Sequence, residues 1–196
     1  MGGLILLVAV LLIAVVFFVN LYNRLVTGRN RYQNAYAQID VQLRRRYDLI
    51  PNLVESVKGY MAHEKETLAA VINARNSAMG ASRQAAQAPG DPRAMQQLAA
   101  AEGALDSTLG RLFALSEAYP DLKANQNMAQ LIEELRSTEN RIAFARQAFN
   151  DAVTLYNTQR EMFPGSLIAG SFNFGAAQLL EESAPEVKAV PRVSFS

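Results

Sequence analysis

The sole histidine, His63, is followed by Glu64, and this pair begins a zinc-binding helical motif. In His-Glu-x-x-His, two histidines four residues apart share one helix face and chelate one zinc ion. Thr67 stands where the second histidine is needed, so the motif is broken. The chain also has no cysteine, which excludes a thiolate nucleophile and cysteine-ligated metals. We therefore expect no bound metal and no cofactor.

Paired carboxylates are the other common catalytic set, and pairs such as Glu133-Glu134 and Glu181-Glu182 are adjacent in sequence. Neighbours on a helix diverge by about 100°, so these pairs indicate solvated faces. The sequence contains neither a Gly-x-Ser-x-Gly elbow nor a glycine-rich phosphate loop after a strand. We expect no catalytic residues and no enzymatic activity; if the chain were an enzyme, turnover would depend on His63.

The densest polar cluster is Arg44-Arg45-Arg46-Tyr47-Asp48. Three consecutive arginines on a helix cannot share one face, so at least one must point toward neighbouring helices. One interpretation is ion pairing with Asp48, Glu55 or a glutamate on a facing helix. The other is a docking surface for a partner or an anionic phosphate, and both stay open.

A long apolar segment near the N-terminus indicates how the rest of the chain, including these polar residues, is held in place. The 16 residues Leu4–Val19 carry no polar side chain, and 14 of them are Leu, Ile, Val or Phe. Insertion into a bilayer is favoured by about 4–8 kcal/mol, and the run with its flanks is about 30 Å long. A cleaved signal is the alternative, but it needs a basic start and a small-residue cleavage site. We predict a transmembrane anchor over residues 1–22.

Charges set the expected orientation and exclude one class of partner. Arg24, Arg29 and Arg31 follow the span, so the positive-inside rule puts the N-terminus outside and the remaining residues in the cytoplasm. The same three arginines are the candidate contacts for lipid headgroups. Because the 19 basic residues are nearly balanced by 18 acidic ones, we expect no nucleic acid as a partner. The predicted anchor makes the lipid bilayer an expected partner.

Beyond the anchor, apolar residues recur every seven positions, which is typical of coiled-coil-like helices packed by knobs into holes. The clearest repeat is Leu135, Ile142, Phe149, Tyr156 and Phe163, and others are Leu98, Leu105 and Leu112, and Tyr36, Leu43 and Ile50. No period-2 strand pattern competes. We predict an all-α fold, with a transmembrane helix followed by an elongated antiparallel bundle of long helices over residues 23–165.

Helix punctuation gives the expected boundaries. Asp91-Pro92 caps and opens one helix, Asn125 or Asn127 starts the last long helix, and Phe163-Pro164-Gly165 stops it. Residues 166–196 are expected to form an extended or disordered tail. Pro51 predicts a kink or tight break at about residues 48–52, with Asn52 and Glu55 as a capping box.

The sequence around the arginines closely resembles the LemA family. The block Asp48-Leu-Ile-Pro-Asn-Leu-Val54 is the most specific match. Further matches are Tyr22–Val26, Gly59-Tyr60, His63-Glu64, Ala74-Arg75, Glu117–Asn125, Glu139, Arg146, Asn150, Tyr156-Asn157 and Pro191–Phe195. The resemblance implies an N-terminal anchor, an elongated all-α domain and no established catalytic activity. It also implies a bacterial membrane protein, often linked by genome context to a membrane zinc metalloprotease.

We therefore expect a single-pass, non-enzymatic helical scaffold or adaptor of the bacterial inner membrane, in envelope organisation or beside a membrane protease. A ligand-sensing or signal-transducing membrane protein is the alternative, and it predicts a pocket inside the bundle. A homo-oligomer also stays open, because confinement in a membrane raises effective concentration. The residues expected to contact an unidentified membrane protein partner are Arg44, Arg46, Asp48, Asn52, His63, Glu64, Glu117 and Asn125.

Overall fold

The computed structural model describes residues 1–61, 63–123 and 125–181, and this part of the chain contains six helices and no strand. The helices are α1 (Gly2–Lys58), α2 (Lys65–Gln87), α3 (Pro92–Ser116), α4 (Pro120–Lys123), α5 (Gln126–Glu161) and α6 (Gly165–Ser171). The predicted all-α fold is confirmed.

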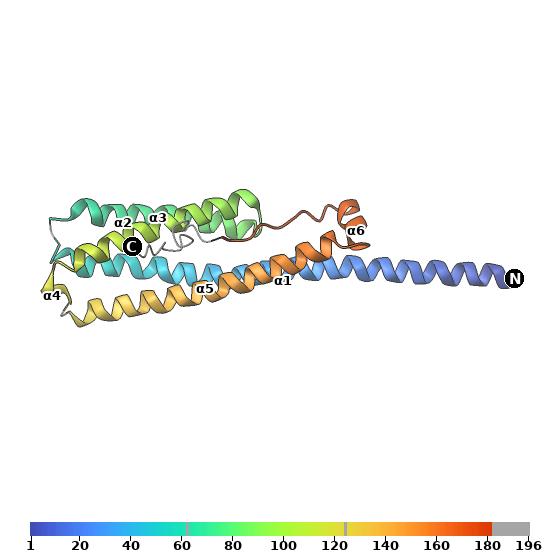
Figure 1. Cartoon of the computed structure of the whole chain (residues 1–196), viewed down its shortest axis with the longest axis horizontal. Helices are drawn as coiled ribbons and strands as arrows, with labels where there is room; N and C mark the ends of the chain where they lie inside the picture. The colour runs from blue at the N-terminus through green and yellow to red at the C-terminus, as the bar shows by residue number, and fades with distance from the viewer. Residues whose placement is uncertain (62, 124, 182–196) are drawn as a thin grey trace, which may run out of the picture.

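The four long helices lie side by side, and each runs antiparallel to the one before it (Figure 1). The short helix α4 lies at one end of the bundle, and the N-terminal part of α1 projects alone from the other end (Figure 1). Helix α1 packs against both α2 and α5, so it is the central element of the bundle. The elongated antiparallel bundle beside one apolar helix is therefore as predicted.

The two parts of helix α1 have different surroundings, although the helix is continuous between them. In its apolar part, Leu4 is 70% exposed and Val19 is 51% exposed, and an 18-residue window there has a mean hydropathy of 3.2 with none of it buried. From Leu25 onward the same helix contributes a buried stripe to the core. One helix therefore offers a segment long and apolar enough to cross a membrane and continues as the centre of the bundle.

The seven-residue repeats form the core. Their buried members on α5 are Leu135, Ile142, Phe149 and Tyr156, and those on α3 are Leu98, Leu105 and Leu112. Phe163, the last residue of the predicted α5 repeat, departs from this pattern and is 79% exposed. Since α5 ends at Glu161, Phe163 no longer follows the helical phase that buries the others.

Both predicted helix starts have side-chain caps. The N–H of Ala94 donates to Asp91 Oδ1 at 2.9 Å, and Pro92 is the first residue of α3. Asn125 Oδ1 accepts from the N–H groups of Asn127 and Met128, at 2.9 and 3.3 Å. These contacts satisfy amides that a helix start leaves without partners.

Of the kink or tight break predicted at residues 48–52, the tight break is wrong, because α1 runs through Pro51 to Lys58. Pro51 has no N–H for the carbonyl of Tyr47, four residues earlier. Arg75 of α2 replaces it: its Nε donates to that carbonyl oxygen at 3.0 Å. Asn52 does not cap a helix here, and its carbonyl instead accepts from Ser56 Oγ at 2.8 Å.

The segment after α5 is more ordered than predicted. Where the sequence predicts an extended or disordered tail from residue 166, the structure has α6 and then an extended stretch held on α5. Asn157 Nδ2 donates to Ala177 O at 2.8 Å and its Oδ1 accepts from Ala177 N–H at 3.0 Å, and Asn150 holds Leu180 in the same way. The rest of the predicted tail, residues 182–196, lies outside the described residues.

Candidate functional site

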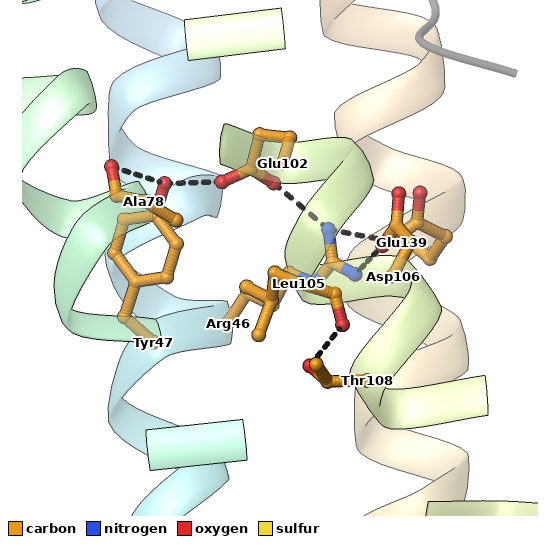
Figure 2. Close-up of polar contacts among 8 residues, drawn as sticks. All are labelled: Arg46, Tyr47, Ala78, Glu102, Leu105, Asp106, Thr108 and Glu139. Carbon is orange, nitrogen blue, oxygen red and sulfur yellow. Dashed lines mark hydrogen bonds and ion pairs between the residues drawn. The ribbon is translucent and has the colours of Figure 1, made fainter. Parts of the chain in front are cut away.

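Arg46 lies at the centre of a polar cluster inside the bundle (Figure 2). The residue is only 4% exposed. Its Nη1 lies 2.9 Å from Glu102 Oε2 of α3 and 3.3 Å from Glu139 Oε2 of α5, and its Nη2 pairs with Asp106 of α3. One guanidinium on α1 therefore joins three helices.

The position of Arg46 on the helix explains its burial. Leu43 and Ile50, three residues before and four residues after it, belong to the buried stripe of α1, so Arg46 shares their face. Arg44 points away from this face; its side chain is 67% exposed and pairs with Asp40 at 2.6 Å. Of the two alternatives for the arginine cluster, ion pairing with a glutamate on a facing helix applies to Arg46.

Tyr47 adds a second contact to the cluster from the neighbouring position on α1. Its hydroxyl donates to Glu102 Oε1 at 2.5 Å and lies 3.3 Å from the carbonyl oxygen of Ala78 on α2 (Figure 2). Both oxygens of the Glu102 carboxylate are therefore bonded within the bundle. A buried polar network whose members are satisfied rigidifies the core that contains it.

Burial and charge act in opposite directions on these groups. Burial raises the pKa of Glu102, although Arg46 and the Tyr47 hydroxyl favour its charged form. Burial also raises the pKa of Tyr47. For Arg46, burial works to lower the pKa, but Asp106, Glu139 and Glu102 together raise it, so the guanidinium stays charged. The cluster is built to hold helices together, with its one cation fully engaged by carboxylates.

A cavity of about 440 Å³ opens beside this cluster, between α3 and α5. Leu109, Phe113 and Ile132 supply apolar walls, and Arg46 and Arg136 lie among its polar groups. Pockets of this size hold small molecules when apolar walls are combined with a few placed polar groups. In the described part of the chain, no group of three or more His, Cys, Asp or Glu residues is arranged to hold a metal ion.

Several predicted contact residues gather at the end of the bundle opposite the apolar segment. The α1–α2 connection and the turns around α4 both lie there (Figure 1). Asn125 Nδ2 donates to the Tyr60 hydroxyl at 3.2 Å, which joins the two connections. His63 and Glu117 are exposed and Glu64 is half-buried. We call this surface, made by Tyr60, His63, Glu64, Glu117 and Asn125, the far end.

The remaining predicted contacts lie on the sides of α1. Asp48 is 80% exposed at its side chain and lies 3.9 Å from the guanidinium of Arg75 on α2. Asn52 is also exposed. With Arg44, these residues form a polar surface next to the buried cluster and separate from the far end.

The three arginines after the apolar segment lie on two faces of α1. Arg24 and Arg31 are exposed and line a cavity of about 700 Å³ between α1 and α5, together with Phe17 and Gln159. Arg29 lies on the other side, with its guanidinium carbon 5.3 Å from the ring centre of Phe174. Two of the three predicted headgroup contacts therefore share an open cavity at the base of the bundle.

A model of the LemA family matches residues 35–195. The match covers most of the chain and includes the Arg46 cluster, the far end and the segment held by Asn150 and Asn157. The chain belongs to the LemA family. No curated protein matches it. The LemA match begins after the apolar segment, so it assigns the bundle to the family independently of the anchor.

Two groups of residues in this LemA bundle were missed by sequence reasoning. Glu102 follows Leu98 by four residues and precedes Leu105 by three, so it occupies a position of the buried stripe. A charged residue there needs a buried partner, and that signal was available in the sequence. Nothing in the spacing indicated that Asn150 and Asn157 hydrogen-bond the backbone of a later segment, because amide side chains are equally common on solvated helix faces.

Proposed function

We propose that this LemA protein is a membrane-anchored, non-enzymatic scaffold that presents the far end of its bundle to a partner. The observation that carries the proposal is the continuity of α1, which joins an exposed apolar segment to the core of the bundle in one helix. About 36 residues separate Tyr22 from the end of α1, which corresponds to roughly 55 Å. The anchor would thus hold the far end at a fixed height above the bilayer.

The proposed location is the bacterial inner membrane, with a single pass and the bundle in the cytoplasm. Arg24 and Arg31 support it, because they lie exposed at the base of the bundle, where anionic headgroups would meet them. A reporter that is active only in the cytoplasm, fused after Ser196, is expected to be active. Activity only from a reporter that requires the outside would reverse the orientation.

The proposed partner is a membrane protein that contacts the far end, either a membrane protease such as a zinc metalloprotease or a component that organises the envelope. His63 and Glu117 offer exposed polar groups there, and Asn125 links the two connections into one surface. A second copy of this chain is the other partner to consider, because membrane confinement favours self-association.

The non-enzymatic part of the proposal is supported by the state of the polar groups in the core. Arg46, Glu102 and Tyr47 are engaged with one another, so none is free to transfer a proton to a substrate. Any turnover measured with the purified wild-type chain is expected to be unchanged in His63→Ala, because His63 is proposed to contact a partner and not a substrate. Loss of a measurable turnover in that variant would identify an enzyme instead.

Affinity capture from detergent-solubilised membranes, followed by mass spectrometry, tests the adaptor role. The full chain is expected to retain one membrane protein or a second copy of itself. A variant with His63→Ala and Glu117→Ala is expected to lose the protein, whereas Asp151→Ala, which changes an exposed acidic residue in the last third of α5, is the control that keeps it. Crosslinking of native membranes that returned only monomer would refute the proposal.

Ligand sensing is the second candidate function, and the cavity between α3 and α5 is the observation that favours it. Gly110 lines this cavity, and apart from the adjoining chain of α3 no atom lies within 4 Å of where its Cβ would stand. Gly110→Leu therefore fills the cavity and also improves the helix propensity of α3. A sensor is expected to lose its response in this variant, whereas a scaffold is expected to bind its partner as before.

A further inference from the structure

Four large apolar side chains are exposed where α5 gives way to α6. Met162 is 61% exposed, Phe163 79%, Leu167 56% and Phe172 59%. On α6 itself, Ile168 and Ala169 are buried, so the helix already uses one face for packing and presents Leu167 outward. We call these four side chains the apolar patch, and large apolar side chains exposed together in this way mark contact with a membrane or a partner.

The patch lies beside the base of the apolar segment. Helix α6 is at the end of the bundle from which the N-terminal part of α1 projects (Figure 1). The ring of Tyr22 meets that of Phe172, with centres 5.1 Å apart, and that of Phe174, with centres 5.5 Å apart. Tyr22 follows Val19, the last residue of the apolar run, by about 4.5 Å along the helix axis.

The dimensions of a bilayer place this contact at the boundary between the hydrocarbon core and the headgroup layer. The hydrocarbon core is about 30 Å thick, and headgroups add about 5–8 Å on each side. When the run and its flanks, residues 2–22, fill the core, Tyr22 lies where the core meets the headgroup layer, and Phe172, which touches Tyr22, lies at the same depth.

The charges around the patch suit this position. Arg24, Arg29 and Arg31 follow Tyr22 within three helical turns, and Arg29 stacks over Phe174. Membrane elements that lie in the interface combine apolar side chains, which reach the edge of the acyl chains, with cations at the level of the headgroups.

We infer that α6 and the corner before it, residues 162–172, form a second membrane contact that lies in the interface of the leaflet from which α1 emerges. The occupant of the patch is the lipid surface. The inference rests on the proposed membrane anchoring. Since α6 is packed on α1 and α5, this contact would fix the rotation and tilt of the whole bundle, so that the far end points in one direction from the membrane.

The absence of tryptophan from the chain allows a clean test with single-tryptophan variants. The probes are Phe163→Trp and Leu167→Trp in the full chain, inserted into phosphatidylcholine and phosphatidylglycerol vesicles whose acyl chains are brominated near the headgroup. Phe144→Trp is the matched control, because Phe144 is 73% exposed on α5 but lies about 25 Å farther along the helix from the patch. Phe18→Trp, within the span, reports the anchor itself.

Bromine quenches tryptophan only on contact, so fluorescence loss reports membrane depth. The inference predicts strong quenching at Phe163→Trp and Leu167→Trp and none at Phe144→Trp. If Phe18→Trp is quenched while both patch probes behave like Phe144→Trp, the inference is overturned and the anchoring stands. If the emission of a patch probe is blue-shifted but not quenched, a second copy of the chain covers the patch. That result also overturns the inference. An unquenched Phe18→Trp would overturn the proposed anchoring, and the inference with it.

Discussion

Arg46 meets Glu102 where water is largely excluded, while Asp106 and Glu139 approach it from the half-exposed side. Removing a charge from water costs several kcal/mol, and close, well-bonded partners offset that cost. The Tyr47 hydroxyl completes the shell of Glu102. The stability of this part of the bundle therefore depends on Arg46. Without it Glu102 has no cation to offset its desolvation cost, whereas without Glu102 the guanidinium still pairs with Asp106 and Glu139.

Arg46→Met is expected to destabilise the bundle by about 3–5 kcal/mol, because it leaves a buried carboxylate without its cation. Urea denaturation followed by circular dichroism measures this cost. The matched control is Arg44→Met, which removes an exposed pair and is expected to cost less than about 1 kcal/mol. Adding Glu102→Gln to Arg46→Met should recover most of the loss; equal costs for the two arginines would contradict the cluster's role.

The pH dependence of stability gives a second prediction at this scale. Burial raises the pKa of Glu102 above its usual 4.5, so the folded state keeps this proton at pH values where the unfolded chain has released it. The contribution of Glu102 to stability is therefore present at low pH and is lost as pH rises through its folded pKa. Glu102→Gln removes this loss, so its stability relative to wild type should increase as pH rises from about 4.5. Denaturation across a pH series tests this, and a relative stability that falls would mean that the Glu102 pKa is lowered.

Sequence reasoning at the residue scale reached Arg46 but only part of its surroundings. Three consecutive arginines forced at least one of them inward, and a facing glutamate was one of the expected partners, beside Asp48 and Glu55. Which glutamate it is depends on how α1, α3 and α5 align along their axes, and no local pattern encodes that alignment. Asp106 and Glu139 are also half-exposed, so nothing in their positions separates them from solvated residues.

At the scale of the elements, α1 carries the largest difference between expectation and structure. A proline inside a helix leaves one carbonyl without its donor, which is why a break at Pro51 was the reasonable prediction. The structure supplies the donor from another helix, since Arg75 bonds Tyr47 O. Ile50 and Leu53 on either side of Pro51 are fully buried, so continued packing also favours an unbroken helix.

Pro51→Ala is therefore expected to stabilise the protein, by up to about 3 kcal/mol, because alanine restores the missing N–H in a helix that is already continuous. Arg75→Ala is expected to be costly in the wild-type chain and less costly when combined with Pro51→Ala. A double-mutant cycle by urea denaturation measures this coupling. Additive effects would show that Arg75 does not serve the carbonyl that Pro51 leaves free.

Helix starts were better predicted than the chain after the last long helix. Asp91 and Asn125 cap helices through bonds to amides two or three residues away, and such local chemistry is legible in sequence. The docking of residues 172–181 depends on Asn150 and Asn157, which lie 20 or 30 positions before the residues they hold. Contacts between residues so far apart in the sequence produce no periodic pattern. The sequence therefore predicted an extended or disordered tail where the structure has helix α6 and the docked segment after it.

At the scale of the whole molecule, one helix supplies both the apolar segment and the centre of the bundle. This follows from two patterns that are plain in the sequence: an unbroken apolar run and then a seven-residue repeat. Both patterns are strong because each describes many residues, so the fold class and the order of the helices were predictable. The far end became recognisable as one surface only when the antiparallel arrangement brought the α1–α2 connection and the turns around α4 together (Figure 1).

The most direct test of the account is alkaline carbonate extraction of membranes that contain the full chain, with intact-mass analysis of the product. The account predicts that the protein stays in the pellet and retains residues 1–22. A Leu11→Lys, Leu12→Lys control should move to the supernatant, because two lysines at the centre of the span cost about 5–7 kcal/mol. Wild-type protein in the supernatant, with the mass of a chain that has lost the apolar run, would contradict the proposal of an anchored scaffold.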